Sequence, residues 1–396
     1  MVAVPHTLTS LQASENSLAP HYSSFRVSEQ LLFTGHSHQA WPDAGFAGQK
    51  QAWLDAALHA DGKWDAVQEQ VDRVCAGYRT LMGGCEGDLT LDSNTHALVV
   101  RFLSALPLRD RPRIVTTDGE FYSVRRQLDR LAEEGVEVVK VSADPVDTLG
   151  ERLAAEVDDR TSCAMVSSVL FGSGLIASGL SRVAEACSAV GAEMLVDAYH
   201  SLGVVPFSLK GMDQAFVIGG GYKYLQCGEG VCVLRVPPGC SMRPVVTGWF
   251  AEFAELAVAR TPGEVPYGVG SARFAGSTYD PTSQYRAAAV MGFFEEQGLD
   301  ASFLRAVSQH QVGLLAETFR SLDLDPDTVR LRHDVLTTER AGFLALEAPE
   351  AGGLCTRLLE RGVRTDARGT VLRFGPAPYH SDAQIVDAIA VLSEVL

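Results

Sequence analysis

The sequence predicts an α/β protein with a large domain on a mostly parallel seven-stranded sheet and a smaller C-terminal α/β domain. From about residue 89 to residue 236, short apolar runs alternate with helical periods, and strands separated by helices form parallel sheets covered on both faces. The chain has 396 residues, of which 46% are hydrophobic and 21% charged, as in an ordinary globular protein. That length exceeds what one hydrophobic core fills, so two domains are expected.

The strands of the predicted sheet are short apolar runs, and a helical period follows most of them. Strands are expected at 89–92, 113–117, 136–143, 163–171, 192–198, 215–220 and 230–236, the last two as a closing pair. Helices are expected from Thr95, over 121–135, within 147–157 and over 180–191. Each helix returns the chain to the sheet before the next strand begins, as parallel pairing requires.

The pattern changes after Asp280-Pro281. Helices are expected near 282–298 and 301–322, followed by strands at 342–348 and 370–375 and helices over 352–362 and from Ser381. The predicted organisation is an N-terminal arm (1–45) that joins the small domain, a large domain (46–280), and a helical linker with the small C-terminal domain (281–396).

Charge and hydropathy exclude several classes of function. A net charge of −16 repels phosphate backbones, so nucleic acid is not expected as a partner. No apolar run of about 18 residues occurs, so no membrane span is expected. The N-terminal residues lack the basic and apolar pattern of a secretory signal. The eight cysteines form no Cys-x-x-Cys pair, which favours reduced thiols over disulfides or zinc. We therefore expect a cytoplasmic protein.

Lys223 occupies an unusual position for a lysine. In the run FVIGGGYKYLQCGEG (216–230) it follows an apolar strand and three glycines, and it lies between Tyr222 and Tyr224. The ordinary alternative is a solvated lysine at a glycine turn, but aromatic neighbours make a poor solvated surface. Ligands of open α/β sheets bind beyond the carboxyl ends of the strands, and Lys223 is expected at such an end.

Other polar and aromatic residues are expected at the same edge of the sheet. Asp197 follows an apolar strand, and His200 comes three residues later. Ser93 and Asn94 separate a strand from the next helix, where hydroxyl and backbone N–H groups could bind a phosphate. Phe121 opens another helix. Taken singly, these are ordinary turn, N-cap and core residues.

Taken together, these residues are the components of a site for pyridoxal 5′-phosphate. A lysine amine forms a Schiff base with the cofactor's aldehyde, a carboxylate keeps the pyridine nitrogen protonated, and an aromatic ring stacks on the cofactor. Lys223 and Asp197 are predicted as the catalytic residues and Phe121 as the stacking ring. The expected cofactor is pyridoxal 5′-phosphate, with no metal ion.

Several longer sequence motifs occur between about residue 32 and the C-terminus, in addition to the residues of this site. They are Thr34-Gly35-His36-Ser37, Asp197-x-x-His200, Tyr222-Lys223-Tyr224-Leu225, Val246-Thr247-Gly248-Trp249-Phe250, Arg273-Phe274-Ala275-Gly276-Ser277-Thr278 and Leu372-Arg373-Phe374-Gly375-Pro376-Ala377-Pro378-Tyr379. In this order they resemble kynureninase, within the class V aminotransferase group of fold-type I pyridoxal-phosphate enzymes. The resemblance implies that fold, an amino-acid substrate and a homodimer with a shared active site.

The resemblance also implies a role for each matched position. Lys223 would carry the cofactor, Asp197 would face its pyridine nitrogen, and His200 would lie close to that carboxylate or to the cofactor. Further cofactor contacts would come from Ser93, Asn94, Phe121, Ser167 and Tyr222, with Trp249 and Thr278 reaching the phosphate region from the partner subunit. Arg373 would bind the substrate α-carboxylate with its two-point fork, and His36 and Ser37 would lie near the substrate.

The sequence departs from the family pattern on the substrate side of the site. The Phe-x-Ser-Asp word reads Phe121-Tyr122-Ser123-Val124, so an acidic residue is missing, and only His59 is a loose candidate for recognising an aminophenyl ketone. The implied reaction is hydrolysis of the Cβ–Cγ bond of a kynurenine-type amino acid, which gives alanine and an aromatic acid. Transamination, β-elimination of a cysteine conjugate, and a non-catalytic module that keeps the fold are the alternatives.

Overall fold

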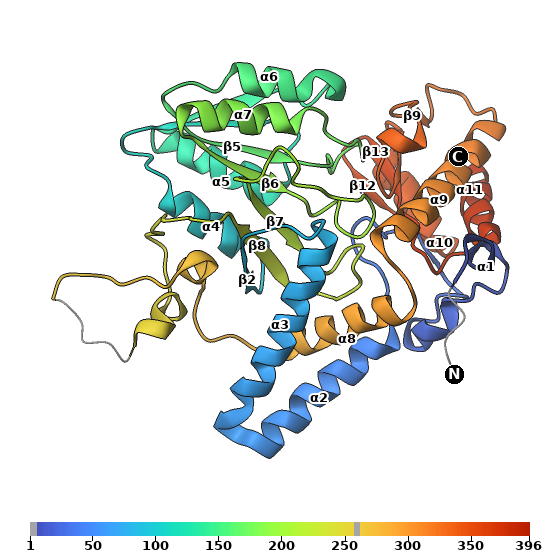
Figure 1. The fold of residues 1–396 in the computed structure, drawn as a ribbon. Coiled ribbons are helices and arrows are strands. Elements are labelled where there is room, and N and C mark those ends of the chain that lie inside the picture. The colour runs from blue at the N-terminus through green and yellow to red at the C-terminus, as the bar shows by residue number, and fades with distance from the viewer. Residues whose placement is uncertain (1–5, 257–261) are drawn as a thin grey trace.

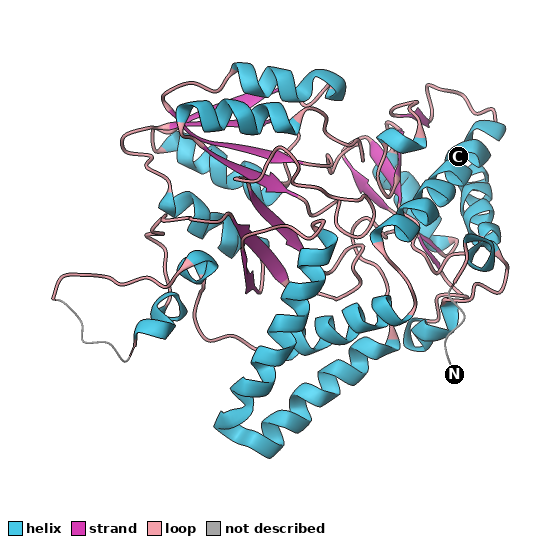
Figure 2. Ribbon diagram, in the orientation of Figure 1, coloured by secondary structure: helices cyan, strands magenta, loops and turns pink. Residues whose placement is uncertain are grey.

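The computed structural model describes residues 6–256 and 262–396 of the chain. Figure 1 shows a large sheet with its helices on one side of the molecule, and the C-terminal sheet and helices, in orange and red, on the other. The strands lie inside each unit and the helices outside, as Figure 2 shows. None of the helices in the described ranges is long and apolar enough to cross a membrane.

The large sheet has seven strands in the order β2-β8-β7-β6-β5-β3-β4. Their bounds are β2 Asp88–Asp92, β3 Arg113–Thr117, β4 Glu137–Val141, β5 Thr161–Ser167, β6 Glu193–Asp197, β7 Phe216–Gly220 and β8 Cys232–Val236. Pairing is parallel from β4 to β7, whereas β8 is antiparallel to both of its neighbours. The prediction of a mostly parallel seven-stranded sheet is therefore confirmed.

Helices connect the strands of this sheet and bury them. They are α4 Thr95–Ala105, α5 Tyr122–Glu133, α6 Leu149–Ala155 and α7 Leu180–Val190. All residues of β5, β7 and β8 are buried, as in strands covered on both faces. The predicted strand at 163–171 ends early, at Ser167, because the chain turns back there and Val169 pairs with Ile176. The apolar run continues past the strand because Val169 and Leu170 are buried in the turn.

The C-terminal unit is a four-stranded antiparallel sheet with helices. Its strands, in the order β12-β13-β10-β9, are β9 Arg330–Leu331, β10 Leu344–Glu347, β12 Asp366–Arg368 and β13 Val371–Phe374. Its helices are α9 Ala301–Ser321, α10 Ala351–Glu360 and α11 Asp382–Val395. The strands expected at 342–348 and 370–375 are found as β10 and β13. The sequence analysis missed β9 and β12 because two or three residues show no periodicity.

The N-terminal residues run along the C-terminal sheet. After α1 Leu8–Gln12, strand β1 Leu31–Leu32 pairs in parallel with β11 Val363–Arg364. The ring of Phe33 lies 6.1 Å from that of Phe374, and both side chains are fully buried. This pairing brings the segment after Phe33 to the carboxyl end of β13.

Three long helices pack together at the base of the view in Figure 1. They are α2 Asp43–His59, α3 Trp64–Leu81 and α8 Thr282–Glu296. The 3-10 helices are η1 Ala19–Phe25, η2 Ala60–Lys63, η3 Val146–Thr148, η4 Trp249–Glu255, η5 Gly270–Phe274 and η6 Thr337–Glu339. The sequence predicts α8, but its pattern does not indicate α2 or α3.

Candidate active site

A cavity of about 290 Å³ lies at the carboxyl ends of β5, β6 and β7 and at the start of α4. The predicted site residues that line it are Ser93, Asn94, Phe121, Ser167, Asp197, His200, Tyr222 and Lys223. These residues span 131 positions of the sequence, from 93 to 223, and the parallel strands bring them to one edge. This is the edge of an open α/β sheet at which ligands bind.

The amine of Lys223 is buried inside this cavity. Its Nζ lies 2.7 Å from Nε2 of His200, and 4.7 Å and 5.3 Å from the ring centroids of Tyr199 and Phe121. Burial lowers the pKa of Lys223 to about 7, although the Asp197 carboxylate opposes the shift. A lysine with such a pKa is substantially neutral near pH 7, and a neutral amine is the form that attacks a carbonyl carbon.

His200 lies against Lys223 at the cavity, where a position close to the Asp197 carboxylate or to the cofactor was expected. Burial, followed by the charge of Lys223, holds the pKa of His200 well below its ordinary value, so the ring is neutral. Among the described residues Nδ1 of His200 has no hydrogen-bond partner, although it is buried. A buried polar atom without a partner is costly, so this ring nitrogen is available to a bound molecule.

Asp197, the last residue of β6, presents a buried carboxylate to the cavity. Oδ1 accepts a hydrogen bond of 2.8 Å from the backbone N–H of Tyr199, and within the described part of the chain Oδ2 has no such partner. Burial raises the pKa of Asp197, and the Tyr199 N–H and the charge of Lys223 oppose that shift. A cationic ring nitrogen would supply the counter-charge that a buried carboxylate requires.

The start of α4 lies at one end of the cavity. The side chain of Asn94 caps the helix by accepting a 2.9 Å hydrogen bond from the backbone N–H of Ala97. Asp92, the nearby carboxylate, is neutralised by an ion pair with Arg101. The first N–H groups of a helix and its dipole favour a bound phosphate. Together with the lysine, carboxylate and aromatic ring, this end makes the cavity fit pyridoxal 5′-phosphate.

Three predicted or loosely suggested residues lie outside the cavity of their own chain. Trp249 on η4 is 43% exposed, and Thr278, in the segment before α8, is also exposed. His59 is exposed at the end of α2, so it has no place beside the cavity in this chain. For Trp249 and Thr278, a role in the site stays a prediction that requires a second subunit.

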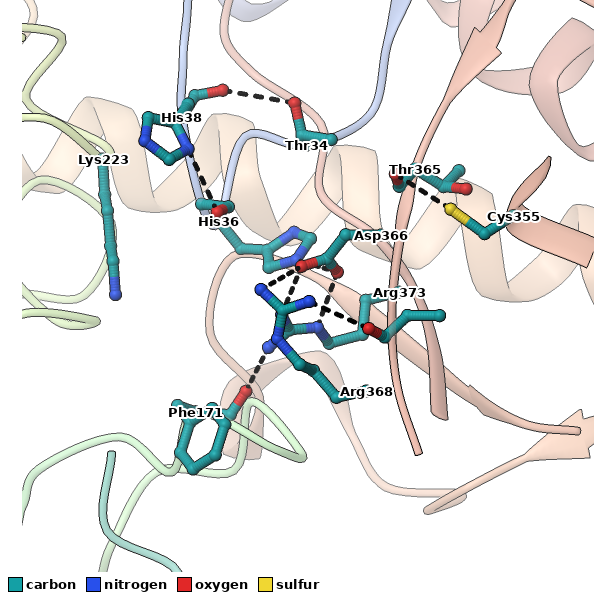
Figure 3. Close-up of polar contacts among 12 residues, drawn as sticks. Thr34, His36, His38, Phe171, Lys223, Cys355, Thr365, Asp366, Arg368 and Arg373 are labelled. Carbon is teal, nitrogen blue, oxygen red and sulfur yellow. Dashed lines mark hydrogen bonds and ion pairs between the residues drawn. The ribbon is translucent and has the colours of Figure 1, made fainter. Parts of the chain in front are cut away.

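Arg373 lies beside the cavity, but two of its guanidinium nitrogens already bind the Asp366 carboxylate. Its Nε donates to Oδ1 of Asp366 at 2.8 Å, Nη2 donates to Oδ2, and Nη1 donates to the backbone oxygen of Phe171 at 2.7 Å (Figure 3). Three of the five guanidinium N–H groups are thus used, which leaves two for a substrate. The side chain is 4% exposed, so neither a solvated arginine nor a free fork describes it.

His36 contacts the Asp366 carboxylate of this pair and does not line the cavity. Its Nε2 lies 2.8 Å from Oδ1 of Asp366, and burial lowers the pKa of His36 to about 4. Although burial opposes ionisation of Asp366, the bonds from His36 and Arg373 hold the pKa of this carboxyl well below its usual range. Ser37 contacts His38 and is also outside the cavity lining. Both were expected near the substrate, and the structure gives His36 an indirect position instead.

The sequence analysis missed Asp366. Asp366 and Arg373 are direct cross-strand partners on β12 and β13, which are joined by the two residues Gly369-Thr370. A two-residue loop with glycine is a hairpin signal, but β12 has three residues and no periodic pattern, so this signal alone does not fix which residues face each other.

Comparison with known proteins identifies relatives over nearly the whole chain. Residues 304–392 match the family model of the kynureninase C-terminal domain. The kynureninase of Pseudomonas fluorescens is 26% identical over 412 residues, covering 97% of this chain and 93% of its own. The kynureninase of Burkholderia pseudomallei (strain 1106a) is 25% identical, with 96% and 93% covered.

Solved structures with the same fold include enzymes that act on sulfur-containing amino acids. The cystine C–S lyase C-DES, in complex with cysteine persulfide, has a TM-score of 0.82 at 15% identity, covering 94% of this chain and 99% of its own. A cysteine desulfurase from Thermococcus onnurineus has a TM-score of 0.77 at 15% identity, with 92% and 94% covered. The chain is therefore similar to kynureninases along nearly its whole length, and it has the fold of the class V, fold-type I pyridoxal-phosphate enzymes.

Proposed function

We propose that this chain binds pyridoxal 5′-phosphate on Lys223 and hydrolyses the Cβ–Cγ bond of a kynurenine-type α-amino acid. The observation that carries the proposal is the buried Lys223 amine, which shares one cavity with the Asp197 carboxylate and the Phe121 ring. The similarity to kynureninases along 97% of the chain supports the choice of reaction.

Each side of the cavity has one task in holding the cofactor. Lys223 would hold it covalently, Asp197 would pair with its ring nitrogen, and Phe121 would stack on its ring. Ser93, Asn94 and the first N–H groups of α4 would bind the phosphate. When bound, pyridoxal phosphate supplies an electron sink that stabilises negative charge at the substrate α-carbon.

Lys223 also moves the substrate protons. With a pKa of about 7, the amine accepts a proton from the α-carbon and gives it back without a large energy difference at neutral pH. The neutral His200 ring, 2.7 Å away, accepts a hydrogen bond from Nζ and fixes the direction of its lone pair. Lys223 is thus both the attachment point and the proton carrier.

Arg373 binds the substrate carboxylate with the two N–H groups that Asp366 and Phe171 leave free. Asp366 holds the guanidinium by two contacts, so the free end keeps one orientation. Because Asp366 also offsets the charge of Arg373, this anchor contributes chiefly geometry and hydrogen bonding, less net charge.

We further infer a homodimer whose active sites include residues of both subunits. Apolar side chains are exposed along the segment that contains η4, with Phe253 at 59% and Val269 at 86%. Exposed apolar side chains that gather in one region are typical of protein interfaces. Trp249 and Thr278 belong to the same region and would reach the partner's phosphate-binding end from there.

Two experiments test this function. The first identifies the lysine that binds the cofactor, and the second identifies the reaction. The purified protein should show the absorbance of lysine-bound cofactor, and borohydride followed by peptide mapping should place the label on Lys223. Lys223→Ala should retain no label, whereas Lys210→Ala, a surface control, should label normally. Label on another lysine, or no cofactor uptake, would refute the assignment.

A substrate panel then tests the reaction. Kynurenine and 3-hydroxykynurenine should yield alanine and the matching aromatic acid. Release of pyruvate from cysteine conjugates would instead identify a C–S lyase, and keto-acid-dependent turnover would identify an aminotransferase. Either result, without alanine release from a kynurenine, would overturn the proposed reaction but leave the cofactor assignment standing.

A further inference from the structure

Glu120 is a buried carboxyl group directly behind the cavity. It is 3% exposed and precedes Phe121 in the chain, but it does not itself line the cavity. Its Oε1 accepts hydrogen bonds from Oγ1 of Thr117 at 2.7 Å and from the backbone N–H of Ser167 at 3.1 Å. Its Oε2 lies 2.6 Å from Oγ of Ser167. The proposed function above gives this carboxyl no task.

These contacts place Ser167 between Glu120 and the cofactor site. Thr117 and Ser167 are the last residues of β3 and β5, and Glu120 bridges the two strand ends. Ser167 is the cross-strand partner of Asp197 and lines the cavity. The Ser167 hydroxyl therefore has Glu120 on one side and the cavity on the other.

The surroundings of Glu120 favour a neutral carboxyl group. Among the described residues no lysine, arginine or histidine contacts it, and the charged group that acts on it is the Asp197 carboxylate. Burial raises the pKa of Glu120 to about 7, the hydrogen bonds from Ser167 and Thr117 oppose this, and Asp197 adds to it. An uncompensated buried carboxylate is costly, so binding a proton is favoured.

Geometry determines which oxygen carries that proton. The backbone N–H of Ser167 can only donate, so Oε1, which it contacts, must accept. The proton of a neutral Glu120 would therefore lie on Oε2 and be donated to Oγ of Ser167 across 2.6 Å, the reverse of the direction in which the Ser167 hydroxyl donates to an ionised Glu120. With its lone pair engaged by Glu120, Ser167 has its own proton free to point into the cavity. An ionised Glu120 would take that proton, and Ser167 would present only an acceptor.

We propose that Glu120 is a positioning residue: it keeps a proton on Oε2 and so makes the Ser167 hydroxyl a hydrogen-bond donor to bound pyridoxal phosphate. This inference rests on the proposed cofactor but not on the proposed reaction. It concerns the direction of one hydrogen bond, which is set by a residue that does not touch the cofactor.

The test measures cofactor binding and absorbance, without turnover, in apoprotein reconstituted with pyridoxal phosphate. Glu120→Gln reproduces the neutral acid, because its carbonyl oxygen accepts and its amide N–H donates. It should keep the wild-type dissociation constant and absorbance maximum. Glu120→Ala and Ser167→Ala should each bind the cofactor about three- to tenfold more weakly, with the same displaced absorbance maximum. Glu193→Gln, a half-buried carboxyl at the opposite end of β6, is the matched control and should not change either value.

The double variant Glu120→Ala/Ser167→Ala distinguishes an action through Ser167 from a separate effect. It should bind no more weakly than Ser167→Ala, because the two residues form one unit. If Glu120→Ala does not fold, the wild type and Glu120→Gln are compared from about pH 6 to 9. The wild-type absorbance should then contain a transition that Glu120→Gln lacks, since the other titrating groups are common to both.

Three outcomes would contradict the inference. Glu120→Gln that matches Ser167→Ala would show that Glu120 acts as an anion. Ser167→Ala with wild-type affinity and absorbance would show that its hydroxyl does not donate to the cofactor. A wild-type protein that takes up no pyridoxal phosphate would overturn the proposed function itself, and this inference with it.

Discussion

Arg373 and Asp366 face each other across strands β13 and β12, and the guanidinium holds the carboxylate by two contacts, the Nε–Oδ1 distance being 2.8 Å. Arg373→Ala should lose about 30- to 1,000-fold in kcat/KM, because the two oriented guanidinium N–H groups that would bind the substrate carboxylate are removed. Arg373→Lys should recover little, since an ammonium lacks the planar fork. Steady-state kinetics on the substrate found by the panel measure both. Wild-type efficiency in Arg373→Ala would mean that the carboxylate binds elsewhere.

Asp366→Asn should raise KM more than it lowers kcat. The amide keeps one acceptor for Arg373 but loses the second, so the guanidinium is less firmly oriented and binds the substrate less well. A loss of about three- to thirtyfold in kcat/KM is expected, smaller than that of Arg373→Ala. Arg368→Ala is the control, because this exposed arginine also approaches Asp366, at 3.4 Å, from outside. Tighter substrate binding in Asp366→Asn would show that Asp366 competes with the substrate for Arg373.

The stability of the cofactor-free protein should rise with pH because of Lys223. Its pKa is lowered from 10.5 to about 7, so between these values the unfolded chain binds more protons than the folded one. Stability therefore increases with pH in this window and is independent of Lys223 below it. Relative to Lys223→Met, the wild type should gain at most about 5 kcal/mol in free energy of unfolding from pH 7 to 10.5. Urea unfolding of both apoproteins gives this difference, and parallel pH profiles would contradict the buried, uncharged amine.

Asp197→Asn should fold and bind the cofactor but lose most of its turnover. The amide no longer favours a protonated ring nitrogen, so the carbanion formed at the substrate is poorly stabilised. A loss of about 100-fold or more in kcat is expected, with nearly full cofactor occupancy by absorbance. Glu193→Gln serves again as the control, since Glu193 lies on the same strand outside the cavity. Unchanged turnover in Asp197→Asn would remove this carboxylate from the mechanism.

Trp249→Asp should produce monomers that bind the cofactor weakly. A charge in the exposed apolar region around η4 opposes its burial against a second subunit. Sedimentation velocity measures the oligomeric state, and cofactor titration measures the consequence for the site. Leu359→Asp is the matched control, because Leu359 on α10 is 50% exposed but lies on the C-terminal unit. A wild-type protein that is an active monomer would refute the shared site.

The location of the cofactor cavity could be predicted because it depends on the order of strands and helices. Asp197 ends a strand and Lys223 follows one, and parallel pairing brings such positions to one edge. The sequence could therefore place eight of the residues that line the cavity, of which Ser167 follows from the resemblance alone, without any distance.

The contacts of Asp366 with Arg373 and of Glu120 with Ser167 could not be predicted, because they depend on which side chains face each other at close range. Glu120 is an acidic residue just before a helix, a common solvated position, and only the structure shows it buried. The engagement of Arg373 with Asp366 depends on the register of two short strands, of which one has no recognisable pattern. His36 likewise reaches Asp366 because β1 pairs with β11 and Thr34 pairs with Gly375.

Because β1 pairs with β11, His36 is attached to the same C-terminal unit as Asp366 and Arg373. If the C-terminal unit rotated as a whole, these three residues would travel together, and of the contacts described for Arg373 only the bond to the Phe171 oxygen would be broken. Binding of a substrate carboxylate by Arg373 and rotation of the C-terminal unit would then both depend on the hydrogen bond from Arg373 to the Phe171 oxygen. An N-terminal deletion that removes β1 would act on the carboxylate anchor from the far end of the chain, although no deleted residue touches a substrate.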